Sequence, residues 1–308
     1  MYSRRNLRIK VMQALYSHLQ NPAKDINVIV KWLQQSIEQS DKLYLLNLYF
    51  CIRVAEYSKD DEQVQASKFL LTDEEKKVNT SIYSNAFVNG FLKENDYSVF
   101  VEKQKPHLQV DDDIIRKIYL ELKNAEPYKK FVAENTGSTK DVQAIFNYLY
   151  GEIIYKSELF HSLMEELFPG WMDEQTFIHK RIDMAFKTGK IEMADLKQDE
   201  AIKFAYELID KTYYCENELT ELIKPKLRNW DADRLAAVDL ILIKLALCEI
   251  LYFENVPIKV SINEYIDISK LYSTPKSKDF VNGIVDKIKN ELLRDGKIQK
   301  AGRGLIND

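Results

Sequence analysis

The sequence predicts an all-α protein. Only 9 of its 308 residues are glycine and 7 are proline, so long uninterrupted helices are expected. Hydrophobic residues recur at helical spacing along most of the chain, and no strong period-two alternation of the kind found in strands is present. With 45% hydrophobic and 30% charged residues, the chain has an ordinary globular composition and enough length for one large domain or two.

The N-terminal two thirds of the chain are expected to hold most of the helices. Residues 4–20 form the first, because Leu7, Val11 and Leu15 lie on one helical face. A second, long helix is expected over residues 26–58. Further helices are expected over residues 81–92, 111–134, 139–168 (one or two helices), 173–187 and 198–227.

The C-terminal third shows the clearest helical pattern. One apolar helix is expected near residues 235–252. Ser261 and Glu264 have the spacing of a capping box, which predicts that the next helix begins there. Pro275 suits the first position of the last helix, and the polar, glycine-containing residues 294–308 are expected to be disordered.

Charge and motif content limit the classes of function. The net charge of −4 excludes a globally basic protein, yet residues 1–24 carry five basic side chains and no acidic one. Three widely spaced cysteines favour a reducing compartment, and no signal-peptide or membrane-spanning pattern is found, so a cytoplasmic location without a membrane is expected. The histidine spacing and the lack of a glycine-rich phosphate loop predict neither a metal nor a cofactor.

Stretches at the two ends of the chain carry a resemblance. Ser3–Arg8 runs directly into Gln13–Ser17 near the N-terminus, and Val256–Glu264 and Lys278–Lys287 lie near the C-terminus. Together they resemble the NusB family of bacterial transcription antitermination factors. The sequence looks like a long form of that family, with a large helical insertion after the first helix.

The resemblance implies a fold and a set of boundaries. The family fold consists of two small antiparallel helical bundles, to which an inserted helical region is added here. The expected parts are residues 1–23 (first helix with the basic motif), 24–196 (insertion of unknown role), 197–230 (remainder of the N-terminal bundle), 231–293 (C-terminal bundle) and 294–308 (disordered tail).

The resemblance also implies a function without catalysis. Similar proteins pair with NusE, a small-subunit ribosomal protein, and bind the boxA element of nascent ribosomal RNA transcripts. Through that complex they act indirectly on the RNA polymerase elongation complex. The expected partners are therefore NusE and boxA-like RNA.

Two basic groups are the expected RNA-binding sites. Arginine is unfavourable at a helix N-terminus, so Arg4, Arg5 and Arg8, with no acid nearby in sequence, point to an external anion. The alternative is a solvated basic helix start. The second group, Lys276, Ser277 and Lys278, opens the last helix, where free N–H groups favour phosphate, although exposed lysines are common.

Five residues are the expected partner-binding set. Tyr16 offers a ring for stacking or for contact with NusE. Glu249 lies in an apolar stripe and needs a partner, either within the core or in NusE. Phe280 is either core or partner-facing, and Asn282 with Gly283 suggests a close approach by a helix, a partner or RNA.

Other functions remain as alternatives. An RNA cytosine methyltransferase, to which NusB-like modules are sometimes fused, needs a glycine-rich cofactor loop that this chain lacks. A non-catalytic helical protein–protein adaptor, or an RNA-binding module in ribosome biogenesis, fits the same helical pattern. An adaptor would bind its partners without strong salt dependence.

Overall fold

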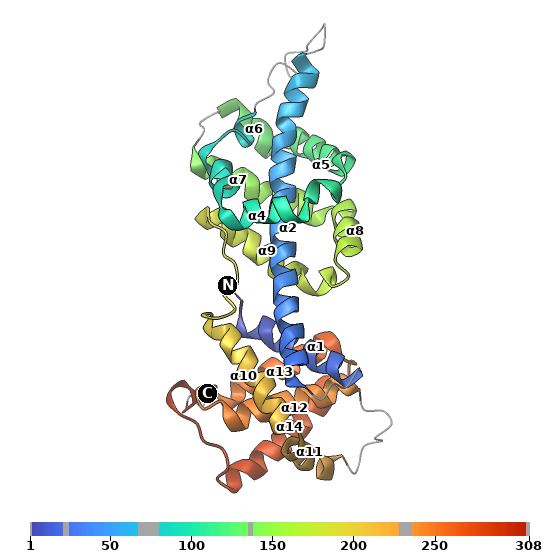
Figure 1. Cartoon of the computed structure of the whole chain (residues 1–308), viewed down its shortest axis with the longest axis vertical. Coiled ribbons are helices and arrows are strands. Elements are labelled where there is room, and N and C mark those ends of the chain that lie inside the picture. The colour runs from blue at the N-terminus through green and yellow to red at the C-terminus, as the bar shows by residue number, and fades with distance from the viewer. Residues whose placement is uncertain (1, 21–24, 67–79, 135–137, 228–235, 306–308) are drawn as a thin grey trace. The chain divides into compact units, whose positions relative to one another are not determined.

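The chain consists of helices wherever its structure is described. The computed structural model describes residues 2–20, 25–66, 80–134, 138–227 and 236–305. Every regular element in these ranges is a helix (Figure 1), which confirms the predicted all-α class. Within the same ranges, no helix is long and apolar enough to cross a membrane.

Two compact units make up the chain, and each is described by itself. We call residues Glu38–Met193 the internal unit, and residues Tyr2–Ile37 together with Ala194–Asp308 the terminal unit. The internal unit begins at Glu38 and ends at Met193, whereas the insertion was expected over residues 24–196. Helix α2 (Ile26–Ala66) is longer than expected, and its first part, up to Ile37, belongs to the terminal unit. The expected boundaries at 23/24 and 230/231 lie outside the described residues.

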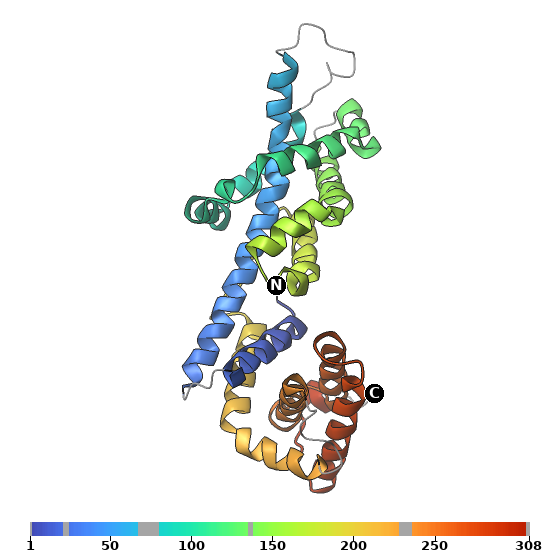
Figure 2. The same ribbon diagram turned by 90° about the vertical axis from the view of Figure 1, so that its right-hand side faces the viewer.

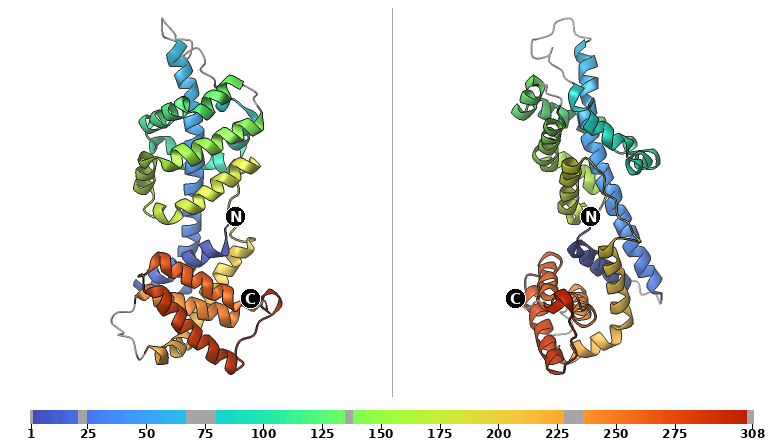
Figure 3. Two further views of the ribbon diagram at one scale, coloured as in Figure 1. Left: turned by 180° about the vertical axis from the view of Figure 1, so that it is seen from behind. Right: turned by 90° about the vertical axis from the view of Figure 1, so that its left-hand side faces the viewer.

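The internal unit is built on the second part of α2. Figure 3 shows the other helices of this unit, coloured green to yellow, crossing it. They are α3 (Ala86–Lys93), α4 (Asn95–Gln104), α5 (Asp112–Asn124), α6 (Glu126–Glu134), α7 (Thr139–Tyr148), α8 (Glu158–Leu167) and α9 (Trp171–Thr188). No helix was predicted over the residues of α4. The expected stretch over 139–168 contains two α-helices. The second begins after Ser157, whose side chain caps it by accepting a hydrogen bond from the Phe160 N–H.

Buried polar groups tie α2 to its neighbours in the internal unit. The Tyr150 hydroxyl donates to Asn47 Oδ1 at 2.9 Å, and both residues are fully buried. One turn further, the ring of Phe50 packs edge-on against Phe160, with centroids 5.0 Å apart. Since these contacts satisfy buried polar atoms and fill the core, they make α2 the central helix of the unit.

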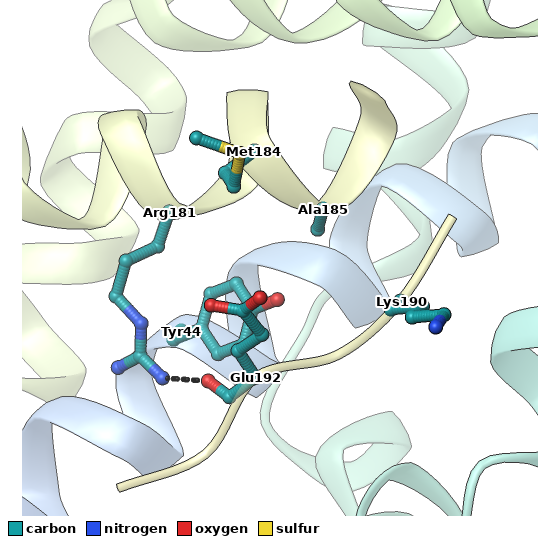
Figure 4. Close-up of a pocket in the computed structure, with 6 residues that line it drawn as sticks. All are labelled: Tyr44, Arg181, Met184, Ala185, Lys190 and Glu192. Carbon is teal, nitrogen blue, oxygen red and sulfur yellow. Dashed lines mark hydrogen bonds between the residues drawn. The ribbon is translucent and has the colours of Figure 1, made fainter. Parts of the chain in front are cut away.

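A charged cluster around Arg181 also lies in the internal unit (Figure 4). Arg181, which is only 6% exposed, donates to Asp41 Oδ1 at 2.6 Å and to the Glu192 backbone carbonyl at 2.7 Å. Its guanidinium lies 4.0 Å from the centre of the Tyr44 ring. Burial raises the pKa of the Tyr44 hydroxyl to about 12. A small hollow beside this cluster is lined by Tyr44, Arg181, Met184, Ala185, Lys190 and Glu192.

The terminal unit holds the two ends of the chain. Its helices besides the first part of α2 are α1 (Arg4–Gln20), α10 (Glu200–Tyr214), α11 (Glu216–Ile223), α12 (Ala237–Tyr252), α13 (Ile258–Tyr272) and α14 (Ser277–Arg294). Helices α1, α10 and α12 pack on one another, and so do α12, α13 and α14 (Figure 2). The two expected helical groups are thus present, and α12 belongs to both. A helix that is apolar all round, as α12 is, suits such a buried position.

The two helix starts predicted after α12 are wrong. Helix α13 begins at Ile258, and the Ser261 hydroxyl donates to Glu249 rather than capping a helix. Pro275 lies in a turn before α14, whose cap residue is Lys276. In both places a tertiary contact or a turn outweighs the local signal.

The expected disorder of the C-terminal tail is wrong for the residues described. Lys300 Nζ donates to the Phe253 carbonyl at 2.9 Å, at the end of α12. The Ala301 N–H donates to the Glu254 carbonyl at 3.0 Å. A Cβ atom on Gly304 would lie 1.8 Å from that same carbonyl oxygen, so only glycine fits there. Residues 306–308 lie outside the described residues.

Candidate functional site

A buried ion pair joins the first helix to the C-terminal bundle. Arg8 Nε and Nη2 donate to the two carboxylate oxygens of Glu249 at 2.9 and 2.6 Å. The same carboxylate accepts the hydroxyls of Ser261 at 2.7 Å and Tyr265 at 3.0 Å. Glu249 is fully buried and the Arg8 side chain is only 4% exposed. The carboxylate therefore has all its donors inside the terminal unit.

The contacts with Glu249 favour the charged form of Arg8. Burial alone lowers the pKa of Arg8, but the hydrogen bonds and negative charge of Glu249 outweigh that effect and raise it overall. Burial also raises the pKa of the Tyr265 hydroxyl well above its usual value, so this hydroxyl remains a donor. Two sequence-based assignments are wrong for this reason: Arg8 is not free to bind RNA, and Glu249 is not a partner-facing carboxylate.

Arg5 is exposed but is not unpaired. Its side chain is 44% exposed, and its Nε and Nη2 donate to Glu264 and Asp267 of α13, each at 2.8 Å. The hydrogen bond to Glu264 is the main cause of a raised pKa at Arg5. At Asp267 the pKa is lowered, first by Lys270 and then by Arg5. The premise that the arginines have no acid nearby is therefore wrong for Arg5 and Arg8.

Arg4 is the exposed member of the motif that lies against a ring. Its guanidinium is 4.9 Å from the centre of Phe204 on α10, while Arg8 lies 5.1 Å from the same ring. Phe204 is buried, so the guanidinium groups of both arginines lie over a fixed ring. Arg4 and Arg5 are consequently the two arginines of the motif that a ligand could reach.

The start of α14 keeps two of its three predicted residues at the surface. Lys276 and Lys278 are exposed. Ser277 is 2% exposed, and its hydroxyl donates to Asp239 at 2.8 Å and accepts the Thr274 N–H at 3.2 Å. Its predicted role in binding phosphate is wrong, because the hydroxyl is occupied within the core.

The remaining predicted partner residues divide between surface and core. Phe280 is 5% exposed, so the partner-facing interpretation is wrong and the ring belongs to the core. Tyr16 is 40% exposed and Asn282 is also exposed. A Cβ on Gly283 would meet nothing within 4 Å, so no close approach by a helix of this structure explains the glycine.

Sequence reasoning missed the acidic side of the site. Glu264 and Asp267 are three residues apart on α13 and therefore share a helix face. That spacing was available in the sequence, but nothing in it indicated which cation the acids meet. Among the described residues, no group of His, Cys, Asp or Glu has an arrangement that could hold a metal ion.

Comparison with known proteins places the chain in a family. The model of the NusB family matches residues 171–290. A transcription antitermination protein NusB from Listeria monocytogenes is 38% identical over 111 residues, which cover 33% of this chain and 87% of that protein. The chain belongs to the NusB family. The NusB match begins at Trp171 in α9, earlier than the expected start at residue 197.

Two other NusB relatives match over less of their length. The protein from Salinibacter ruber is 46% identical over 103 residues, and the one from Chloroherpeton thalassium is 40% identical over 115 residues. These segments cover 33% and 37% of this chain, and 64% and 53% of the two relatives. The chain thus spans roughly half to two thirds of these NusB proteins, and no solved structure matches it.

Proposed function

We propose that this NusB-family chain is a non-catalytic transcription antitermination factor that binds boxA-like RNA in nascent ribosomal RNA transcripts together with NusE. The three relatives described above are themselves named transcription antitermination proteins. The observation that carries the RNA-binding part is the exposure of Arg4 and Arg5 at the start of α1. Through NusE and RNA, the chain would act indirectly on RNA polymerase.

Affinity would come mainly from phosphate contacts. Arg4 and Arg5 begin α1, while Lys276 and Lys278 follow the end of α13. Arg5 is linked to α13 by its ion pairs with Glu264 and Asp267. The two lysines are linked to the same helix by the chain that follows it. Arg8 would hold the site in position, because its buried ion pair with Glu249 fixes α1 on α12. Selection of sequence would depend on unstacked bases and on NusE.

Replacing Arg4 and Arg5 together by alanine is expected to weaken binding of a boxA-like RNA oligonucleotide about tenfold or more at physiological salt. The salt dependence should also flatten, by about 0.7 in slope for each lost phosphate contact on a single strand. The measurement is fluorescence anisotropy over a salt series, with and without purified NusE.

A matched control removes two other exposed cations of the terminal unit, Lys287 and Lys297. This variant has the same change in net charge and should bind RNA nearly as the wild type does. Equal losses in both double variants would show a non-specific charge effect. Salt-insensitive binding of NusE with no RNA affinity would favour the adaptor function instead.

Gly283→Ala tests whether Asn282 and Gly283 face NusE. Alanine should raise the free energy of unfolding by about 1 kcal/mol, because it is the better helix former and its Cβ meets open space. The same Cβ should weaken NusE binding, measured by calorimetry. Gly90→Ala on α3, also in open space, is the control and should leave NusE binding unchanged. Normal NusE binding by the Gly283 variant would remove this surface from the interface.

A further inference from the structure

We infer that Glu264 and Asp267 form an acidic clamp that competes with RNA phosphate for Arg5. The inference rests on the proposed RNA-binding function and adds a regulation of that site. Both carboxylates lie 2.8 Å from guanidinium nitrogens of Arg5, on Nε and Nη2. Carboxylate and phosphate engage arginine through the same planar set of donors, so one can replace the other.

The clamp is at the surface, where exchange is possible. The side chains of Arg5 and Asp267 are 44% and 42% exposed, and that of Glu264 is 22% exposed. The pair Arg8–Glu249 differs in being buried, with side-chain exposures of 4% and 0%. RNA can therefore draw Arg5 away from α13 while the buried pair keeps α1 in place.

Each acid of the clamp has a second cation that remains when Arg5 leaves. Lys270 Nζ donates to Asp267 Oδ1 at 2.7 Å. Arg8 Nη1 lies 3.7 Å from Glu264 Oε2. Release of Arg5 to a phosphate therefore leaves neither carboxylate without a counter-charge, which lowers the cost of the exchange.

The clamp also changes the charge that an approaching RNA meets. Arg5 and Arg8 contact three carboxylates, those of Glu249, Glu264 and Asp267, while Arg4 lies against the Phe204 ring. The motif has no acidic residue near it in the sequence, but in the folded chain three carboxylates offset much of its positive charge. Glu264 and Asp267 therefore lower the affinity of the chain for RNA. A partner whose basic side chains bind these two acids would release Arg5 and raise that affinity.

The test is the double variant Glu264→Gln, Asp267→Asn, titrated with a single-stranded boxA-like RNA oligonucleotide over a salt series. We expect about fivefold or greater tightening, because Arg5 no longer has to leave two carboxylates before it binds phosphate. The control Glu207→Gln, Asp210→Asn removes two exposed acids with the same spacing on α10 and should change affinity less than about twofold.

A second comparison isolates Arg5. In an Arg5→Ala background, neutralising Glu264 and Asp267 should produce only the small gain seen with the α10 control. The clamp is overturned if the gain persists without Arg5, equals that of the control, or is absent while the wild type binds RNA. That last result leaves the proposed function standing. If the wild type and the neutralised variant both fail to bind, both proposals fail, whereas binding by the neutralised variant alone supports the clamp.

Discussion

Glu249→Ala is expected to lower the free energy of unfolding of the terminal unit by about 3–5 kcal/mol, because the buried Arg8 guanidinium would lose two hydrogen bonds and its nearest counter-charge. The Ser261 and Tyr265 hydroxyls would lose their acceptor as well. Such a loss is expected of a core carboxylate, and not of one that waits for a partner in NusE. The measurement is hydrogen exchange followed by mass spectrometry, which reports the opening free energy of peptides from α1 and α12.

Arg5→Ala is the matched control for this prediction. Its ion pairs with Glu264 and Asp267 are exposed, so its loss should cost less than about 1 kcal/mol. A cost for Glu249→Ala as small as that for Arg5→Ala would mean that the buried pair does not hold the two helical groups together.

Arg181→Ala is expected to have a comparable effect on the internal unit, about 3–5 kcal/mol, because the buried Asp41 carboxylate would lose the ion pair and the hydrogen bond from Arg181. The Glu192 carbonyl would also lose a donor. Hydrogen exchange should rise in peptides of α9 and the second part of α2, and stay unchanged in α12. Lys180→Ala, an exposed neighbour on the same helix, should leave both units unaffected.

Unchanged exchange in the internal unit of the Arg181 variant would show that the charged cluster is not part of its core. Equal destabilisation of α12 peptides would show instead that the two units unfold together. Only the second outcome would change the description of the chain as two compact units.

The fold class followed directly from the sequence, whereas several details did not. Scarce glycine and proline, with helical periodicity, are enough to predict helices. Helix α4 was missed because Asn95 and Asp96 at its start resemble a loop. Ser261 was misread as a cap because its hydroxyl has a stronger acceptor in Glu249, which lies on another helix.

The ion pairs of the arginine motif could not be predicted from the sequence either. The arginines looked unpaired because no acid lies within residues 1–24. Their partners are 241 residues away for Arg8, and 259 and 262 residues away for Arg5. Local composition cannot identify such pairs, because they form only when α1 packs against α12 and α13. The identity of the motif was readable from sequence, but its charge balance was not.

The most direct test of the central claim is to sequence the RNA that crosslinks to the full chain in its native cells. The proposed function predicts enrichment of ribosomal RNA leader transcripts around boxA-like segments, with loss of that enrichment when Arg4 and Arg5 are replaced by alanine. Crosslinked RNA without such enrichment, or no crosslinked RNA while NusE still co-purifies, would contradict it and favour a protein–protein adaptor.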